Sequence, residues 1–420
     1  MMQSKSERSR LLFNYVVNMF DGAFFGFGMG FSSFSAIIPL FVANLTDSAI
    51  LIGLIPSIHN MGWQLPQLLT ANRLARLQTY KPFVLRMTIN ERLPFFFMAI
   101  VAWFSPGIPK PVSLVLIFLL LIWQGLGAGF AANPWQNLIG KVIPSDYLAT
   151  FFGLQSSAAN LLSSLGSAFA GIILIAMVNP TNFALLFLLT FLMMAISWGF
   201  LSFTREKETI IQEAQSNQPP LLSRIRSILE KDHNFRWFMA VRILFQFGLM
   251  AFSFYTVYVV KYLSATEAEA AYLASALMIV QTIANPLLGW LSDRFTRRKI
   301  MILGAVANVL SALIACLAPS IGWFVPVMIF AGLSNVAFWT IGIAMTMEYG
   351  TETERPTYIG MANSFIAPAT ILAPFLGGLL ADAVSYQATF ILAVIASLVT
   401  VLVLVFFVKD NQRVKKLAVE

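Results

Sequence analysis

Long apolar stretches recur about 12 times along this 420-residue chain and limit its possible folds more than any other feature. A helix needs about 20 apolar residues to cross the hydrocarbon core of a bilayer. Backbone groups in lipid must find hydrogen bonds within helices or closed barrels, and these stretches are too long for barrel strands. The sequence therefore predicts an all-α membrane protein with 12 transmembrane helices. The predicted spans are Phe13–Val42, Ala49–Thr70, Pro82–Phe104, Pro111–Leu138, Leu148–Val178, Thr181–Phe203, Phe235–Leu263, Ala268–Leu291, Lys299–Leu317, Ile321–Tyr349, Pro356–Ala383 and Gln387–Val408.

Composition supports this prediction and argues against other classes of protein. Hydrophobic residues make up 58% of the chain and charged residues only 11%, against about 25% charged residues in soluble domains. The net charge of +8 does not indicate nucleic-acid binding, because the basic residues lie in loops. The single cysteine, Cys316, rules out an intrachain disulfide. No metal or cofactor is predicted, and without a phosphate-binding Gly-Lys-Ser/Thr loop we expect neither an enzyme nor a primary pump.

Basic residues are unevenly divided between the two sets of loops. Cytoplasmic loops carry the excess of Lys and Arg, so both termini are predicted to be cytoplasmic in a multi-pass protein of the inner (plasma) membrane. We expect a monomer in the lipid bilayer with a retained first helix. One set of loops and the tail contain Arg73, Arg76, Lys81, Arg294, Arg297, Arg298, Lys299, Arg413, Lys415 and Lys416, and the other set contains only Lys110 and Lys261.

The longest polar segment divides the chain into two related halves. A shift of 220 residues pairs Phe27-Gly28 with Phe247-Gly248, so the halves are predicted to be parallel repeats with substrate held between them. The predicted divisions are residues 1–203, a linker at 204–234, residues 235–408 and a tail at 409–420. In the linker, Leu221, Ile225, Ile228 and Leu229 share one helical face and Arg224, Arg226 and Lys231 fall elsewhere, which favours an amphipathic helix on the inner membrane surface; the alternative is a solvated linker.

Ionisable residues inside predicted spans are the first candidates for function, because a charge at the bilayer centre costs a few kcal/mol. Asp21 and Arg242 fall one position apart when the halves are superposed. We therefore expect them to face each other, so that protonation of Asp21 biases a conformational equilibrium. The alternative is a permanent salt bridge. Glu91 and Arg92 are adjacent and point about 100° apart, so they should not pair with each other.

Glu91 and Arg92 each need a partner elsewhere in the protein. His59 is then a candidate neighbour of Glu91. A buried network that holds helices 1 to 3 together and a proton relay both remain open.

Uncharged polar and aromatic residues near mid-membrane depth mark the predicted substrate cleft. Amides in lipid must face protein or a water-filled cavity, although some will only join helices. Such a cleft suits a polar-aromatic or amphiphilic organic solute better than an inorganic anion. The cleft candidates are Asn60, Gln64, Gln124, Trp135, Gln246, Tyr255, Gln281, Asn285, Asn335, Trp339 and Asn363.

A short basic loop between two spans reads Gly289-Trp-Leu-Ser-Asp-Arg-Phe-Thr-Arg-Arg-Lys299. It closely resembles the signature loop of the major facilitator superfamily. An ordinary cytoplasmic loop would explain the basic residues but not the Gly, the Asp or the spacing. The resemblance implies the major facilitator fold, with 12 transmembrane helices in two pseudo-symmetric six-helix halves.

The resemblance also assigns a conformational latch to this loop. Asp293 is expected at the N-terminal end of the helix that begins near residues 147–151, where a carboxylate is stabilised, with Arg294 and Arg297 bracing it. The first half contains a degenerate and weaker copy in which Asn72 replaces the Asp. The other latch candidates are Gly289, Arg298, Lys299, Arg73 and Arg76.

The functional expectation is secondary active transport of a small organic solute by alternating access, coupled to protons or another cation. An apolar, aromatic cleft favours export of amphiphilic compounds. However, Gln124-Gly-Leu-Gly-Ala128 resembles the exporter motif without its arginine, which is Leu121 here. Two alternatives remain: cation-coupled uptake of a nutrient, and a non-transporting assembly factor or sensor on the same fold.

Overall fold

The computed structural model describes residues 5–208 and 220–410, and every regular element within those ranges is helical. The tail residues Arg413, Lys415 and Lys416 and the linker residues 209–219 lie outside the described residues. Nine segments in the described ranges are long and apolar enough to cross a membrane. They are Lys110–Val142, Ser145–Ala176, Thr181–Ser202, His233–Tyr262, Ser275–Arg294, Arg297–Leu317, Ile321–Thr346, Arg355–Ala383 and Tyr386–Phe406.

The three other predicted spans are also helical, but they are more polar or interrupted. The third predicted span is α5 (Lys81–Phe104), which carries Arg86, Glu91 and Arg92. The second is divided between α3 (Ala49–Gln64) and α4 (Gln67–Leu74).

The first predicted span, Phe13–Val42, is not one continuous helix. It consists of α1 (Lys5–Phe31) and the short α2 (Ile37–Ala43). Between them the Ser33 hydroxyl accepts a hydrogen bond from the Ser35 backbone N–H and contacts the Ser35 hydroxyl. Serine side chains that bond the nearby backbone compete with helical hydrogen bonds, which explains the break.

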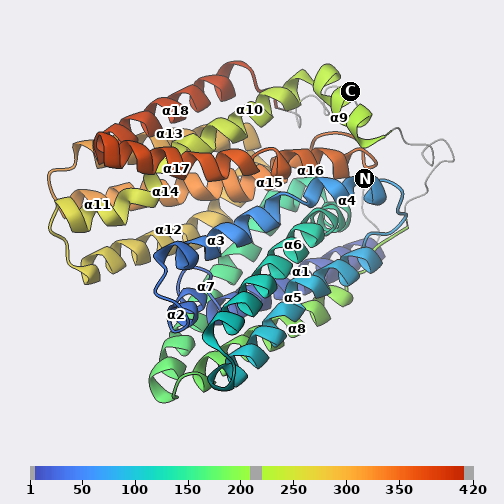
Figure 1. Ribbon diagram of the computed structural model, residues 1–420. Helices are drawn as coiled ribbons and strands as arrows, with labels where there is room; N and C mark the ends of the chain where they lie inside the picture. Colours follow the sequence, from blue (N-terminus) through green and yellow to red (C-terminus); the bar gives the residue numbers. More distant parts are fainter. Residues whose placement is uncertain (1–4, 209–219, 411–420) are drawn as a thin grey trace. The chain divides into compact units, whose positions relative to one another are not determined.

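The chain divides into two compact units, shown as ribbons in Figure 1. The first unit contains residues 1–144, 158–218 and 352–364, and the second contains 145–157, 219–351 and 365–420. Two short segments are therefore grouped with the other half of the sequence. The start of α7 (Leu148–Ala176) belongs to the second unit, and α16 (Arg355–Ser364) belongs to the first. The predicted boundaries at residues 203 and 235 stay predictions.

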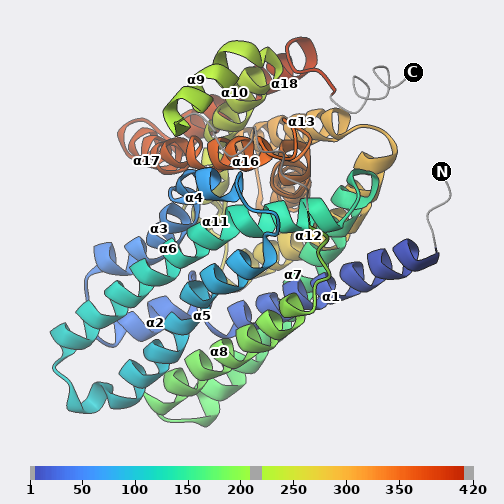
Figure 2. The same cartoon turned by 90° about the vertical axis from the view of Figure 1, so that its right-hand side faces the viewer.

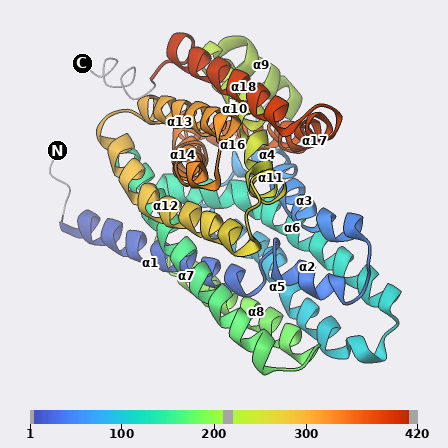
Figure 3. The same cartoon turned by 90° about the vertical axis from the view of Figure 1, so that its left-hand side faces the viewer.

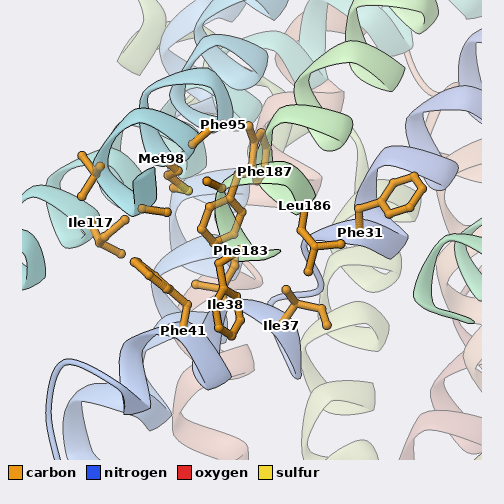
Figure 4. Close-up of a cluster of buried hydrophobic side chains, with 14 of the residues drawn as sticks. Phe31, Ile37, Ile38, Phe41, Phe95, Met98, Ile117, Phe183, Leu186 and Phe187 are labelled. Carbon is orange, nitrogen blue, oxygen red and sulfur yellow. The ribbon is translucent and has the colours of Figure 1, made fainter. Parts of the chain in front are cut away.

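In the first unit, α8 (Thr181–Ser202) packs against both α1 and α5, and α5 also packs against α6 (Lys110–Val142). Figure 2 shows these helices side by side. Figure 4 shows the apolar cluster at one end of this bundle, where Phe41 contacts Phe183 and Phe187 at ring-centroid distances of 5.2 and 5.6 Å. Lipid is as apolar as these side chains, so close packing rather than exclusion of water holds such helices together.

In the second unit, α18 (Tyr386–Phe406) packs against α10 (His233–Gly248) and α13 (Arg297–Leu317), as Figure 3 shows. Its apolar cluster centres on Tyr255, whose ring lies 5.6 Å from that of Phe390. The remaining long helices of this unit are α12 (Glu267–Arg294), α14 (Phe324–Val336) and α17 (Ala367–Ala383).

Two of these spans change helical type midway. A 3₁₀ segment, Leu249–Phe254, separates α10 from α11 (Tyr255–Tyr262). A π-helical turn, Ala337–Ile341, separates α14 from α15 (Gly342–Thr346). Single π-helical turns within α-helices frequently mark functional sites.

An asparagine clamp closes each repeat in the same way. Asn14 of α1 donates to the Arg205 carbonyl (2.9 Å) and accepts from the Arg205 N–H (2.8 Å), just after α8 ends. Asn234 of α10 forms the same pair of bonds with Lys409 after α18, at 3.0 and 2.6 Å. The two asparagines are 220 residues apart, which is the repeat shift seen in the sequence.

The predicted linker helix is α9 (Leu221–Lys231). One prediction about it was wrong. Arg224 is buried on the same face as Ile228 rather than away from it. The two positions are four residues apart, so they share a face, and the long arginine stem can cover apolar surface.

Candidate functional site

A buried charge cluster joins three helices of the first unit. Asp21 of α1 accepts a 2.6 Å hydrogen bond from the Ser197 hydroxyl of α8. Arg92 of α5 donates from Nη2 to that hydroxyl (3.2 Å), and Nη2 lies 3.8 Å from Asp21 Oδ1. Asp21 and Arg92 are only 4% and 6% exposed. The ionic partner of Asp21 within the first unit is therefore Arg92. The expectation that Asp21 faces Arg242, which belongs to the second unit, stays a prediction.

Glu91 belongs to the same cluster. Its Oε2 lies 3.5 Å from Arg92 Nη1, so the prediction that these adjacent residues could not pair was wrong. The long guanidinium side chain turns back along α5, where it also donates to the Thr88 carbonyl (3.1 Å) and reaches the Met194 carbonyl of α8 (3.1 Å). The network therefore joins α1, α5 and α8 rather than the first three predicted spans.

His59 does not join this cluster through any described contact. Its Nδ1 lies 2.9 Å from Gln124 Oε1 of α6, and its ring stacks on Phe34 with centroids 3.9 Å apart. The prediction that Glu91 is its neighbour is corrected. Gln124 is fully buried, and its Nε2 has no partner in the described residues. Asn60, one residue along α3 from His59, is exposed.

Trp135 of α6 is half-buried and interacts with the Asp21 carboxylate. The cluster therefore touches one of the predicted cleft residues. Earlier along α6, Trp123 donates a hydrogen bond to the Asn90 side-chain carbonyl of α5 at 3.3 Å. Asn90 and Glu91 lie directly under Gly127 of α6, where an added Cβ would be 2.4 Å from the Asn90 carbonyl carbon. Only glycine permits this close approach of the two helices.

Two other predicted cleft residues connect α16 to α4 and to the end of α3 within the first unit, Gln64 only through its backbone. Asn363 is 1% exposed and donates to Gln67 Oε1 at 2.7 Å. The backbone carbonyl of Gln64 accepts from the Ser364 hydroxyl at 3.1 Å, and that hydroxyl also accepts from the Leu68 N–H. These amides lie where helices join, as the sequence analysis allowed for some of the set.

In the second unit, Arg242 of α10 is 6% exposed. Its Nη1 donates to the Thr346 hydroxyl at 3.2 Å, and its guanidinium carbon lies 6.0 Å from the centre of the Phe238 ring. No carboxylate in the described residues lies within ion-pair distance of it.

The other cleft candidates of this unit differ in how they are bonded. Asn285 accepts from Thr340 of the π-helical turn at 2.5 Å, and Tyr255 accepts from Ser311 at 3.1 Å. Both side chains are thus engaged within the unit. Gln246, Gln281 and Asn335 are half-buried and Trp339 is 47% exposed.

The Asp293 carboxylate at the end of α12 lies against the first turn of α7. Oδ1 accepts from the Ala149 N–H at 3.2 Å, and Oδ2 accepts from the Thr150 N–H at 2.6 Å. These amides are in the first turn of a helix, where no intrahelical acceptor exists. A carboxylate at this end is also favoured by the helix dipole. Gly289 permits the approach, because an added Cβ there would lie 2.5 Å from the Ala149 carbonyl oxygen.

Arg297 completes this contact. It is 1% exposed and lies 3.0 Å from Asp293 Oδ1 and 2.5 Å from Glu348 Oε1. It also donates to the Ser145 carbonyl ahead of α7. Glu348 looked like a residue near a span end in the sequence, but it is buried and bound to Arg297. The sequence shows no signal for this role of Glu348, because it does not show that Arg297 is buried and needs a second carboxylate.

The other basic loop residues have different contacts. Arg294 lies over the Trp290 ring at 5.4 Å and, contrary to the expectation, has no described contact with Asp293. Arg298 donates to the Leu404 and Val405 carbonyls at the end of α18. The Lys299 N–H bonds Thr296 as part of the α13 cap. In the degenerate copy, Arg73 lies over Phe83 at 4.9 Å, Asn72 is half-buried and Arg76 is exposed.

A second polar centre, missed in the sequence, surrounds Glu206 just after α8. Its two carboxylate oxygens accept from the Tyr80 and Lys81 N–H groups at the start of α5, each at 2.8 Å. Lys141 of α6 lies 2.9 Å from the same carboxylate. Burial and the nearby Glu352 carboxylate raise the pKa of Tyr80 to about 12. Nothing in the local sequence distinguishes Glu206 from its charged neighbours Arg205, Lys207 and Glu208.

Comparisons with known proteins agree with this fold. The E. coli fucose:proton symporter FucP superimposes with a TM-score of 0.75 over 94% of this chain and 98% of its own, at 13% identity. The proton:xylose symporter XylE gives a TM-score of 0.73 over 96% of this chain and 97% of its own, at 14% identity. The chain thus has the fold of these solved transporters.

The sequence comparisons match parts of the chain to known transporters. The family model described as Major Facilitator Superfamily matches residues 250–420. Multidrug resistance protein 2 of Bacillus subtilis is 29% identical over 145 residues, which are 34% of this chain and 36% of that protein. The matches span about a quarter to a third of the first curated relatives' own lengths. The family model thus matches the C-terminal part of the chain, and the solved transporters share the fold of nearly the whole chain.

Proposed function

We propose that this protein is a secondary active transporter that moves a small organic solute across the membrane by alternating access, coupled to protons. The fold and the family support transport as the general class. The observation that carries the coupling proposal is the buried cluster in which Asp21 and Glu91 share the single guanidinium of Arg92.

Charge balance within the cluster gives it one place for a proton. Two ionised carboxylates and one guanidinium leave one uncompensated negative charge, and burying such a charge costs several kcal/mol. Binding one proton makes the cluster neutral. The proton would stabilise the conformation in which these helices pack as they do here, and its release would favour another.

Asp293 and its partners act as the conformational latch in this proposal. The contact of Asp293 with the first turn of α7 is made by buried, charge-assisted hydrogen bonds, so it favours the conformation that contains it. Breaking it allows α7 to leave α12. The weaker first-half copy around Asn72, Arg73 and Arg76 has the corresponding role.

For the direction of transport, export of amphiphilic compounds is the favoured form. Half-buried or exposed aromatic side chains such as Trp135 and Trp339 among the cleft candidates support it, as does the similarity to a protein named for multidrug resistance. Nutrient uptake with a cation is the second candidate, supported by the fold shared with fucose:proton and xylose:proton symporters. A monomer in the inner membrane with both termini cytoplasmic completes the proposal.

The test is proton flux in proteoliposomes that contain the purified full-length protein and an internal pH-sensitive dye. A panel of amphiphilic dyes, fucose and xylose is added outside, and solute-driven changes in internal pH are recorded. Asp21→Asn should abolish the pH change, whereas Asp382→Asn, at an exposed position of α17, should not. If no solute moves protons in the native protein, or if Asp21→Asn behaves as the native protein does, coupling at this cluster is wrong.

A further inference from the structure

Arg242 is a buried cation with no carboxylate counter-ion among the described residues. Its single hydrogen bond goes to the Thr346 hydroxyl, which itself donates to the Gly342 carbonyl at 2.7 Å. A guanidinium has five N–H donors, so most of them have no acceptor among the described residues. The nearest aromatic ring, that of Phe238, lies 6.0 Å away, which is the outer limit for a cation–π contact.

Six acids of the second unit have other contacts in the described structure, and a seventh, Asp382, is exposed. Asp293 and Glu348 bind Arg297, and Glu230 binds Arg226. Asp232 caps α10 and Glu269 caps α12. Asp146 lies beside Ser145 in the turn before α7, and Asp382 is exposed.

Two other buried arginines, within or beside the spans, have carboxylate partners that Arg242 lacks among the described residues. Arg92 and Arg297 each have carboxylate oxygens within 4 Å. An isolated buried charge costs several kcal/mol, and charged groups inside membrane spans mark functional sites by default. An anion that binds in part of the transport cycle would offset this cost, and no carboxylate in the part of the chain that the structure describes does so.

A second set of free donors lies beside Arg242. Gln246 is four residues further along α10 and therefore on the same face. Its half-buried side chain has no hydrogen-bond partner in the described residues. On the intervening turn, Phe245 stacks on Phe338 of the π-helical turn with ring centroids 3.4 Å apart. The two polar side chains thus lie close in sequence to a buried aromatic pair.

We propose that Arg242 and Gln246 bind the carboxylate of an organic anion, so that the transported solutes are amphiphilic organic acids. A guanidinium pairs with the two oxygens of a carboxylate in a planar, bidentate geometry, and the Gln246 amide supplies a further donor. This inference rests on the proposed transport function and narrows its substrate class.

The experiment uses benzoate as the probe and benzamide as its uncharged control. Thermal unfolding of the purified full-length protein is followed while each compound is titrated. Benzoate should raise Tm and benzamide should not. Arg242→Gln should weaken benzoate binding by on the order of tenfold or more, the effect of losing a hydrogen bond to a charged group. Arg236→Gln, at an exposed position of the same helix, should bind benzoate as the native protein does.

Stability without a ligand gives an independent readout. Removing an unpaired buried cation should raise the Tm of ligand-free Arg242→Gln, whereas a structural arginine would lower it. Gln246→Leu should weaken benzoate binding in a protein of near-native Tm, which keeps the test valid if Arg242→Gln does not fold.

The inference is overturned if benzoate leaves the native Tm unchanged or stabilises Arg242→Gln equally. Binding is measured without flux, so this failure leaves proton-coupled transport of an uncharged solute intact. If benzoate binds but no solute drives proton flux, the proposed transport function fails and the anion site remains supported.

Discussion

Replacing Asp293 with alanine should release the first turn of α7 from α12. The native carboxylate accepts from the Ala149 and Thr150 N–H groups at 3.2 and 2.6 Å and pairs with the buried Arg297 at 3.0 Å. Each hydrogen bond to a charged group is worth about 1.5–3 kcal/mol. Because water can satisfy part of what is lost, we take about 3 kcal/mol for the whole contact, which corresponds to roughly a hundredfold change in an equilibrium.

Hydrogen–deuterium exchange of the protein in nanodiscs measures this directly. The amides of Ala149 and Thr150 belong to a helical first turn and have no intrahelical acceptor, so their protection depends on Asp293. The peptide that contains them should exchange on the order of a hundredfold faster in Asp293→Ala. Asp232→Ala is the matched control, since Asp232 caps α10 by accepting from the Phe235 N–H. It should accelerate exchange there and leave α7 unchanged.

One result would refute this reasoning. If the start of α7 keeps its native exchange rate in Asp293→Ala, the Asp293 carboxylate does not hold that turn. The latch would then have to depend on Arg297 alone, through its bond to the Ser145 carbonyl. In that case Arg297→Gln, rather than Asp293→Ala, would accelerate exchange at residues 145–150.

Two further predictions concern the ends of the helices. The pKa of Tyr80 is raised to about 12 from an ordinary 10, so its contribution to stability is complete below pH 10 and is lost between pH 10 and 12. Tyr80→Phe should therefore remove about 3 kcal/mol of the stability that the native protein loses over this range. Tm measured across the range checks this, and an unchanged pH profile would contradict it. Asn14→Ala and Asn234→Ala each remove two hydrogen bonds from the asparagine side chain to the backbone. Each change should destabilise the protein by about 1–3 kcal/mol, measured as a loss of Tm relative to Asn44→Ala at an exposed position. Unequal effects would show that the two clamps are not equivalent.

The membrane-spanning helices were predictable because the length of each apolar run is enough to indicate a helix that crosses the bilayer. Spans such as Thr181–Phe203 are almost uniformly apolar, and the structure gives Thr181–Ser202. Breaks inside spans were not predictable in the same way. The π-helical turn at Ala337–Ile341 has no proline or polar run to mark it, and Ser33 and Ser35 interrupt the first span through hydrogen bonds that hydropathy does not measure.

The types of residue in the candidate site were predictable, but their partners were not. A charged residue in an apolar run is visible in any sequence, so Asp21, Arg92 and Arg242 were identified from it. The choice of Arg242 as the partner of Asp21 assumed that the repeats place equivalent positions opposite each other. The structure shows instead that Ser197, a residue with no special signal, connects Asp21 to Arg92.

This change of partner alters what Arg242 can do. A permanent salt bridge with Asp21 would have explained both charges, and neither would have needed a ligand. With Asp21 bound to Ser197 and Arg92, the buried cluster of the first unit has one surplus negative charge, from Glu91. In the second unit, the buried Arg242 has no carboxylate partner among the described residues. A surplus negative charge is neutralised by a cation as small as a proton, and a surplus positive charge requires an anion. The two charges therefore favour different ligands, and only the second distinguishes one organic solute from another.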